Sequence, residues 1–313
     1  MLRLYLALAG LSIVLANHPL KYEICANGIS ALGQALVPQH PSRRIVEGLL
    51  FNDEADMIEI HLNELKHVVD LFVIVESNVT FSGQPKRLVF SDIKDKFLDI
   101  ADKIVNIVVS DLPEGSVWIK ERHLRQTTYQ KNLVKKGDIF LLADIDEIVR
   151  PTVLQYLKSC SGYDGKSVLF DLDIFYYSYS TKLRKNHLGV FYPRAHVVDD
   201  ESLVDANQLR GSTPTLKVPN AGWHCSNCFS TMAELRRKVE SYSHQEFNLP
   251  RYKTKEHLIN VVRNGLDWFL RSDVGFDYVE PRDIPQYVKM HMDSFDYMLE
   301  RRGPTAAFRD FYA

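Results

Sequence analysis

Two carboxylates one residue apart are the feature of this sequence that points most directly to chemistry. Asp144 and Asp146 close the run DIFLLADID and are followed by Glu147. Alternate side chains of a strand point the same way, so this pair can bind one hard cation such as Mg²⁺ or Mn²⁺. A divalent cation on a diphosphate neutralises the charge that builds up as the diphosphate leaves. With a nucleoside diphosphate sugar, that opens the anomeric carbon to attack by an acceptor hydroxyl.

A second such pair, Asp171 and Asp173, lies inside residues 168–179, whose alternating pattern predicts a single strand. There the acids can face solvent or a cleft, and the pattern does not decide between the two. Because a match to Asp-x-Asp alone is weak, the buried strand expected before Asp144 is what separates the pairs. We therefore predict the cation site at Asp144 and Asp146.

Apolar runs alternate with amphipathic segments in the part of the chain that must position these acids. The runs are too continuously apolar for half-exposed strands, so their sheet must be covered on both faces. Strands and helices in succession imply parallel pairing with right-handed crossovers. We expect an α/β fold, with a mostly parallel central sheet flanked by helices. The expected strands are residues 45–51, 70–76, 104–109 and 138–144, and the expected helices are residues 55–68, residues 118–136 and a segment beginning at Pro151.

In such a sheet, reactive groups gather beyond the carboxyl ends of the strands. Three loops qualify, and all are rich in carboxylates and amides: residues 52–54, residues 76–86 and residues 144–147. No GxGxxG or GxxxxGK[ST] motif occurs in the sequence. Classical dinucleotide binding and P-loop hydrolysis are therefore poorly supported.

Composition excludes several further classes of protein. The chain has 313 residues, of which 45% are hydrophobic and 25% charged, which excludes a disordered, collagen-like or multi-span membrane protein. Its 38 basic and 40 acidic side chains nearly cancel, so we expect no nucleic acid partner. Four cysteines in a chain of this length do not make a disulfide scaffold.

The N-terminal segment indicates targeting. Residues 4–16 (LYLALAGLSIVLA) are almost wholly apolar and follow Arg3. The run is short for a stable membrane span, which takes about 20 residues, and it fits the apolar core of a secretory signal. We expect residues 1–16 to be a cleaved signal peptide or a short signal-anchor that holds the chain in the membrane. Residues 17–42 would form a stem, and residues 43–313 the catalytic domain.

Two cysteines sit close to a histidine in the segment GWHCSNC, residues 222–228. A structural zinc site needs four nitrogen or sulfur ligands, and no second Cys-x-x-Cys or histidine pair stands at ligand spacing. In a secretory compartment a disulfide is the expected state. Cys225 can pair with Cys228, or one of them can pair with Cys160. Trp223 can stack on a sugar or fill the core, and the core is the expectation.

Several separated blocks together resemble glycosyltransferase family 17. They are FNDEADMIEIHLNEL, VDLFVIVESNVTFSGQPKRLVF, DIFLLADIDEIVRP and AGWHCSNCF, within a stretch from Arg43 to Tyr287. The resemblance implies a GT-A-like fold, a UDP-GlcNAc donor, Mn²⁺ or Mg²⁺, and inversion at the anomeric carbon. It also implies a glycan or glycoprotein acceptor and β-1,4 transfer to mannose of N-glycans. We expect a location in the secretory pathway, either in the Golgi membrane or, if residues 1–16 are cleaved, as a secreted protein.

The resemblance suggests roles for individual residues. Asp144 and Asp146 would hold the metal and the diphosphate, and His224 would complete the metal shell or remain a structural imidazole. The other candidates for donor binding are polar side chains at the strand ends and on the long helix. Uridine and ribose would contact Asn52, Glu54 and Glu76, and the phosphates would contact Lys86 and Arg125.

Inverting displacement also needs a base that takes the proton from the acceptor hydroxyl. We favour Glu246, because its segment SHQE matches a block of the family, and Asp173 is second. The remaining candidates are Asp171, Asp205 and Asp267. Two other classes stay open: an inactive carbohydrate-binding protein of the same fold, and a sugar-nucleotide nucleotidyltransferase. The intact acid pair argues against the first, and the missing glycine-rich loop against the second.

Overall fold

The structure is a computed structural model that describes residues 37–39, 41–184, 192–199 and 204–313. The predicted targeting segment, residues 1–16, and most of the predicted stem lie outside the described residues. Of the stem, β1 (Val37–Pro38) is described and pairs with β7 (Cys160–Ser161). Within the described ranges, no helix combines the length and apolarity that a membrane crossing requires.

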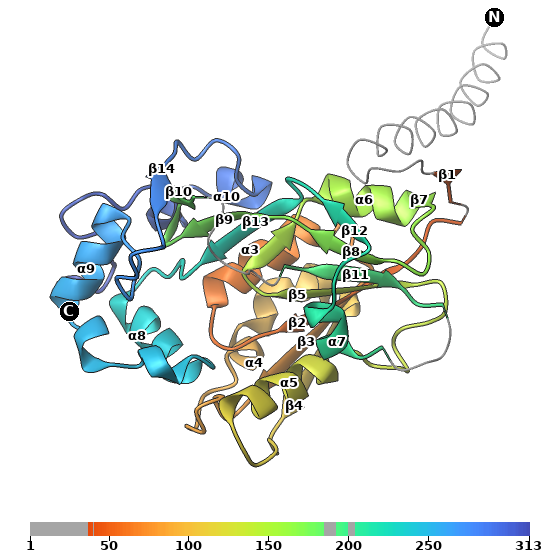
Figure 1. Cartoon of the computed structure of the whole chain (residues 1–313), viewed down its shortest axis with the longest axis horizontal. Helices are drawn as coiled ribbons and strands as arrows, with labels where there is room; N and C mark the ends of the chain where they lie inside the picture. Colours follow the sequence, from red (N-terminus) through yellow and green to blue (C-terminus); the bar gives the residue numbers. More distant parts are fainter. Residues whose placement is uncertain (1–36, 40, 185–191, 200–203) are drawn as a thin grey trace, which may run out of the picture.

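A seven-stranded, mainly parallel sheet forms the centre of the molecule (Figure 1). Its order is β12-β8-β11-β5-β2-β3-β4, and β11 runs antiparallel to both of its neighbours while the other pairs are parallel. This confirms the predicted class and the four predicted strands. The strands are β2 (Ile45–Leu50), β3 (Leu71–Ser77), β4 (Ile104–Val109), β5 (Ile139–Asp144), β8 (Ser167–Phe170), β11 (Arg194–Val197) and β12 (Leu216–Val218).

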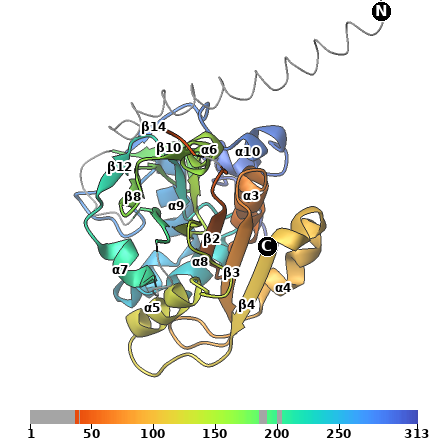
Figure 2. The ribbon, with the colours of Figure 1, turned by 90° about the vertical axis from the view of Figure 1, so that its right-hand side faces the viewer.

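Helices cover both faces of this sheet, as the continuous apolar runs predicted (Figure 2). In β2, Ile45 packs into a cluster with Ile58 of α3 (Ala55–Leu65), whereas the next residue, Val46, packs into another with Leu209 of α7 (Ala206–Gly211). All four side chains are buried. Alternate residues of β2 thus pack against opposite layers, which is why both faces of the strand are buried.

The other helices lie around these layers. The predicted helix over residues 118–136 is shorter than expected and ends at Thr127, because residues 128–138 form turns before β5. The helix at Pro151 is confirmed. The remaining elements are α4 (Val89–Ile93), η1 (Lys94–Lys103), α5 (Val117–Thr127), α6 (Pro151–Ser159), α8 (Met232–Ser241), η2 (Gln245–Phe247), η3 (Pro250–Tyr252), α9 (Lys255–Asn264), α10 (Gln286–Met290) and η4 (Asp296–Met298).

A second, five-stranded sheet adjoins the carboxyl end of β5, in the order β14-β10-β9-β13-β6. The predicted single alternating strand over residues 168–179 was wrong. The chain leaves the central sheet after Phe170 and enters the second sheet at Asp173, so the acids Asp171 and Asp173 mark a crossing between sheets. The strands are β6 (Glu147–Val149), β9 (Asp173–Tyr176), β10 (Ser178–Leu183), β13 (Gly222–Ser226) and β14 (Phe276–Tyr278).

Candidate active site

A cavity of about 510 Å³ opens where β2 and β5 end, which is the edge predicted to carry the chemistry. Helices α5, α7 and α8 and strand β13 supply its other walls. Six of the predicted site residues line it: Asn52, Glu54, Arg125, Asp144, Asp146 and His224. Residues from six separate elements therefore converge on one space, although they are far apart in the sequence.

Asp144 is held by a buried arginine. The guanidinium of Arg210 on α7 donates to Oδ2 of Asp144 at 2.8 Å and to both carboxylate oxygens of Glu147 at 2.7 Å. Glu147 is 1% exposed and also accepts the backbone N–H of Asp144. Its carboxylate therefore links residues 144–147, which we call the acid turn, to α7.

Asp146 faces a different partner. Strand β5 ends at Asp144 and a turn follows, so the strand alternation that we expected to align the two acids stops before Asp146. The Oδ2 atom of Asp146 lies 3.4 Å from Nε2 of His224. The predicted set of Asp144, Asp146 and His224 is thus divided: Asp144 pairs with Arg210, and Asp146 with His224.

The register of β13 brings His224 to the turn. His224 is opposite Glu147 in the antiparallel pair of β13 with β6, and the N–H of Cys225 donates to the carbonyl of Asp146 at 3.1 Å. A Cβ on Gly222, two residues earlier, would lie 2.0 Å from the carbonyl oxygen of Ile148, so only glycine permits this pairing.

The charges of this pair reinforce one another. Burial alone would raise the pKa of Asp146, but His224 and Lys238 outweigh it and hold the pKa below its usual value. Burial alone would lower the pKa of His224, but Asp146, Glu147 and Asp144 raise it. Asp146 is therefore an anion throughout the neutral range, as a cation ligand must be.

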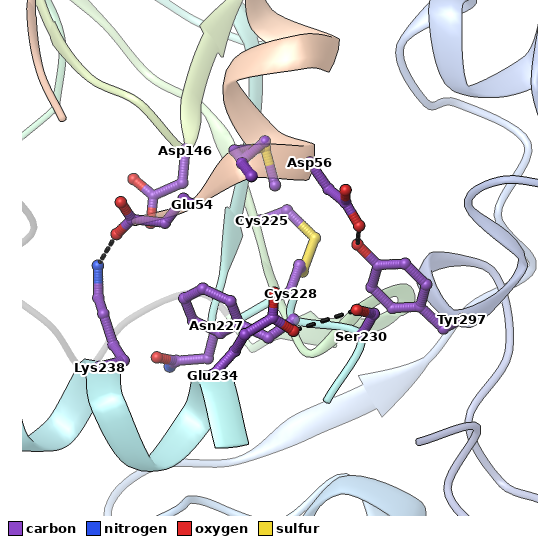
Figure 3. A pocket seen from close by; sticks show the side chains of 13 residues that line it. Glu54, Asp56, Asp146, Cys225, Asn227, Cys228, Ser230, Glu234, Lys238 and Tyr297 are labelled. Carbon is purple, nitrogen blue, oxygen red and sulfur yellow. Dashed lines mark hydrogen bonds and ion pairs between the residues drawn. A yellow bond between two sulfur atoms is a disulfide. The ribbon is translucent and has the colours of Figure 1, made fainter. Parts of the chain in front are cut away.

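A second buried ion pair, between Glu54 and Lys238, lies next to Asp146 (Figure 3). Glu54 Oε1 lies 2.5 Å from Lys238 Nζ, and Oε2 accepts the backbone N–H groups of Asn52 and Asp53. The amide of Asn52 donates to Ser241 on α8 at 3.0 Å. The loop after β2 is therefore joined to α8 across the cavity.

Several polar atoms in this lining have no partner among the described residues. They are buried, and all belong to cavity-lining side chains: Nε of Arg125, Nε of Arg210, Nδ1 of His224 and the hydroxyl of Tyr242. Buried polar groups are almost always hydrogen-bonded. Their concentration here indicates that the cavity receives a polar ligand.

Four predicted site residues do not line this cavity. Glu76 lies outside the cavity lining, and its carboxylate accepts from the Phe90 N–H and from the Asn106 amide. Lys86 donates to the carbonyl of Asn52 at 2.6 Å and lines a neighbouring cavity of about 590 Å³. Asp173 is paired with Lys182 at 2.8 Å on the second sheet.

Glu246 is the fourth. Its carboxylate is 58% exposed and lies 2.7 Å from Nδ1 of His244, and it is His244 that lines the cavity. The less favoured candidate bases are occupied as well. Asp171 pairs with Lys217, Asp205 caps α7 and Asp267 pairs with Arg271.

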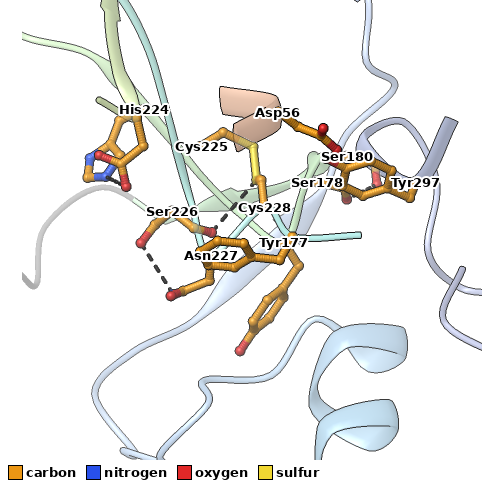
Figure 4. The surroundings of a disulfide bond; sticks show 12 residues. Asp56, Tyr177, Ser178, Ser180, His224, Cys225, Ser226, Asn227, Cys228 and Tyr297 are labelled. Carbon is orange, nitrogen blue, oxygen red and sulfur yellow. Dashed lines mark hydrogen bonds and ion pairs between the residues drawn. A yellow bond between two sulfur atoms is a disulfide. The ribbon is translucent and has the colours of Figure 1, made fainter. Parts of the chain in front are cut away.

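The cysteines beside His224 pair with each other, which decides between the predicted alternatives (Figure 4). Cys225 ends the buried part of β13, and its disulfide to Cys228 closes the turn through Asn227. Trp223 is buried as expected, with its indole N–H donating to the carbonyl of Asp283 at 3.0 Å. The neighbours of His224 on both sides are therefore fixed.

Comparison with known proteins identifies the family. The sequence profile described as glycosyltransferase family 17 matches residues 30–280. The chain belongs to glycosyltransferase family 17. This confirms the resemblance and places the protein among the glycosyltransferases. The matched range contains every residue of the cavity described above.

Relatives of this family 17 chain carry a more specific description. The β-1,4-mannosyl-glycoprotein 4-β-N-acetylglucosaminyltransferases of Rattus norvegicus, Mus musculus and Homo sapiens are 25%, 24% and 24% identical to it over 85% of its length. The chain spans 56–57% of the length of these relatives. Two solved structures, a 4-diphosphocytidyl-2C-methyl-D-erythritol synthase and an inositol-1-phosphate CTP transferase from T. maritima, are 13% identical. They cover 57% and 61% of the chain and 90% and 91% of their own, with TM-scores of 0.33 and 0.35.

The family 17 site contains supporting residues that sequence reasoning missed. His61 is fully buried on α3 and contacts the carbonyl of Ile145, inside the acid turn, at 3.0 Å. Its other nitrogen lies 3.1 Å from the buried carboxylate of Glu47. Although burial lowers the pKa of His61, Glu47 raises it above its usual value overall. The sequence did contain a signal for this pair, because His61 and Glu47 both occur within apolar segments. Such polar groups are rarely buried in a core without a partner.

Asp53 gives a prediction about stability. Burial and the neighbouring Glu54 raise its pKa to about 6, despite Lys238, Arg237 and Lys86 nearby. An acid with a raised native pKa binds more protons when folded, so the native state loses stability as pH rises from about 4 to about 6. We expect Asp53→Asn to raise the free energy of unfolding by about 1–3 kcal/mol at pH 7.5 and by little at pH 4.

Urea unfolding at several pH values measures this difference. Asp92→Asn, at a carboxylate half exposed beside Arg87, is the matched control and should show little effect at either pH. A gain for Asp53→Asn that is the same at pH 4 and pH 7.5 would contradict the assignment of the effect to its titration.

Proposed function

We propose that the chain transfers N-acetylglucosamine from UDP-GlcNAc to a hydroxyl of a glycan, with inversion at the anomeric carbon and with Mn²⁺ or Mg²⁺ as cofactor. The observation that carries the proposal is the cavity at the ends of β2 and β5, where Asp146 and His224 face each other across 3.4 Å. Family membership and the description of the mammalian relatives support the type of transfer.

The donor set of this pair suits a divalent cation. Ligands bonded to one such ion at about 2.1 Å lie roughly 3–3.5 Å apart, which is the separation of Asp146 Oδ2 and His224 Nε2. Among the described residues, no three His, Cys, Asp or Glu side chains form a ready metal site. Two protein ligands are enough for Mg²⁺ or Mn²⁺ when substrate phosphates and water supply the rest.

Charge balance also favours a cation. The lining contains four carboxylates and four Lys or Arg side chains: Glu54, Glu121, Asp144, Asp146, Arg122, Arg125, Arg210 and Lys238. These charges cancel, so the lining alone has no surplus to balance a diphosphate. A bound divalent cation would supply that surplus and stabilise the charge on the departing diphosphate.

The protein's own side chains would then orient the donor. Arg125 has an unpartnered Nε and lines the same cavity as Asp144 and Asp146, so it can donate to the phosphate oxygen of a ligand bound there. Lys238 is held by Glu54 and provides a fixed positive charge across the cavity. Asn52 and Glu54 border the loop after β2 and would contact the uridine or ribose. Asp144 is held by Arg210 and would approach the donor from the other side.

The description of the relatives supports the proposed acceptor and linkage. Their description names β-1,4 transfer to a mannosyl glycoprotein, and we propose the same acceptor class for this chain. A Golgi location, with anchoring in the membrane through residues 4–16, would bring the protein to N-glycans. The predicted base Glu246 does not line the cavity itself, but its carboxylate contacts His244, which does.

Donor turnover by the full-length protein tests the proposed function. The experiment screens UDP-sugars for hydrolysis and for transfer to mannose-containing N-glycans, with Mn²⁺ and with EDTA. We expect UDP-GlcNAc to be the preferred donor, with turnover lost in EDTA and restored by Mn²⁺.

Other outcomes identify the alternatives. Binding of glycan without turnover of any donor would indicate an inactive carbohydrate-binding protein. Release of pyrophosphate from a nucleoside triphosphate and a sugar phosphate would indicate a nucleotidyltransferase.

A further inference from the structure

His244 lines the cavity and is half exposed to solvent. It precedes η2, lines the same cavity as Asp144, Asp146 and His224, and its side chain is 50% exposed. A glycan acceptor must approach from solvent, so a group that serves the acceptor has to be reachable from outside. His244 combines access from solvent with a place in the cavity wall.

The ring of His244 is oriented by contacts on several sides. Its Nδ1 lies 2.7 Å from Oε1 of Glu246. The edge of Trp118 on α5 packs against it with ring centroids 4.8 Å apart, and Tyr242 and Phe247 lie at 5.7 and 6.1 Å. A carboxylate on Nδ1 keeps the proton on that nitrogen, which leaves Nε2 with a free lone pair.

The other candidate bases in the cavity are already engaged. Every carboxylate in the lining is paired: Glu54 with Lys238, Glu121 with Arg125 and Ser243, Asp144 with Arg210, and Asp146 with His224. Glu246 itself is outside the lining, and its hydrogen bond with His244 lowers its pKa, so it remains an anion. Among the described lining residues, Nδ1 of His224 and the Tyr242 hydroxyl also lack a protein partner, but both atoms are buried. The Nε2 atom of His244 belongs to a half-exposed ring, so an acceptor can reach it from solvent.

We propose that His244 is the catalytic base and that Glu246 is its positioning residue. This inference rests on the proposed function. The acceptor O–H bond breaks and its proton passes to Nε2 of His244. The acceptor oxygen forms the new bond to the anomeric carbon of the donor sugar. The bond from that carbon to the diphosphate oxygen breaks, and its electron pair leaves with UDP. The Glu246 carboxylate stabilises the imidazolium that forms, as in other carboxylate–histidine pairs.

The arrangement predicts a pH dependence. A protonated histidine cannot accept a proton, so the transfer rate should fall as the pH is lowered. The charged groups around His244 are Glu246 beside it, Glu121 and Arg122 on α5, and Lys238 on α8. A variant that lacks the His244 imidazole should not show this fall in rate.

Steady-state kinetics of the full-length protein over a range of pH test the proposal. We expect His244→Gln to lower kcat for transfer by about 10²–10⁴-fold and to abolish the acid limb of its pH profile. The KM for UDP-GlcNAc should stay within about threefold, and UDP binding should be unchanged. Glu246→Gln should lower kcat less, by about tenfold, and displace the acid limb, and Glu246→Asp should recover part of the loss. His67→Gln, at an exposed histidine outside the cavity, is the control and should leave the rate unchanged.

Three results would overturn the proposal. If Glu246→Gln abolishes transfer while His244→Gln has little effect, Glu246 is the base. If His244→Gln raises the KM for UDP-GlcNAc at constant kcat, His244 is a donor contact. If the wild-type protein transfers no sugar from any nucleotide donor, the proposed function fails, and the role of His244 fails with it.

Discussion

Asp146→Ala should abolish donor turnover while the protein remains folded. Asp146 is buried beside His224, and its pKa is held below the usual value by His224 and Lys238, so it is an obligate anion in the cavity. Its removal takes away one of the two protein ligands proposed for the cation. We expect kcat to fall by about 10³-fold or more, equivalent to about 4 kcal/mol of transition-state stabilisation.

Turnover of UDP-GlcNAc with saturating Mn²⁺ measures this effect, and circular dichroism checks the fold. Asp171→Ala is the matched control, because Asp171 belongs to the other Asp-x-Asp pair and is bound to Lys217 outside the cavity. It should retain turnover within a factor of about two. Turnover by Asp146→Ala within tenfold of the wild-type value would exclude Asp146 as a cation ligand.

Arg210→Met should cause the largest loss of stability. Arg210 is 6% exposed and is the shared partner of Glu147 and Asp144. Its removal leaves the carboxylate of Glu147 buried without a counter-charge, and such a loss typically costs about 3–5 kcal/mol. We expect the free energy of unfolding to fall by that amount, and the acid turn to lose its order.

Urea denaturation measures this change. Arg184→Met is the control, because Arg184 pairs with Asp277 where both side chains are more than half exposed. It should change the free energy of unfolding by less than about 1 kcal/mol. Adding Glu147→Leu to Arg210→Met should recover part of the loss, since the unpaired charge is then gone. A loss below about 1 kcal/mol for Arg210→Met alone would show that the buried network does not stabilise the turn.

The fold was predictable where residue patterns are local. The strands β2, β3, β4 and β5 read directly from their apolar runs, because strands buried on both faces admit few polar residues. The end of α5 and the break between Phe170 and Asp173 were not predictable in this way. The end of α5 is set by the turns that lead the chain to β5, and the break depends on where the second sheet docks, which is a long-range property.

The sequence predicted which edge of the sheet carries the site. It did not predict the ion-pair and hydrogen-bond partners of the site residues. The rule that loops gather beyond strand ends placed Asn52, Glu54, Asp144 and Asp146 together, and all four line one cavity. The side chains that pair with the site residues, Arg210, Lys238 and His61, lie on helices. Residue spacing does not show that these helices pack beside the site. The same rule does not place Glu76 in the cavity lining, because this strand-end carboxylate accepts a hydrogen bond from the backbone of α4.

Direct measurement of metal and nucleotide binding tests the central claim, that Asp146 and His224 bind a divalent cation that accompanies the donor diphosphate. Isothermal titration of UDP into the full-length protein, with Mn²⁺ and with EDTA, reports the coupling without any need for turnover. We expect UDP to bind at least tenfold more tightly with Mn²⁺, and the difference to disappear in Asp146→Asn and in His224→Gln. Equal UDP affinity with and without Mn²⁺ in the wild-type protein would contradict the account.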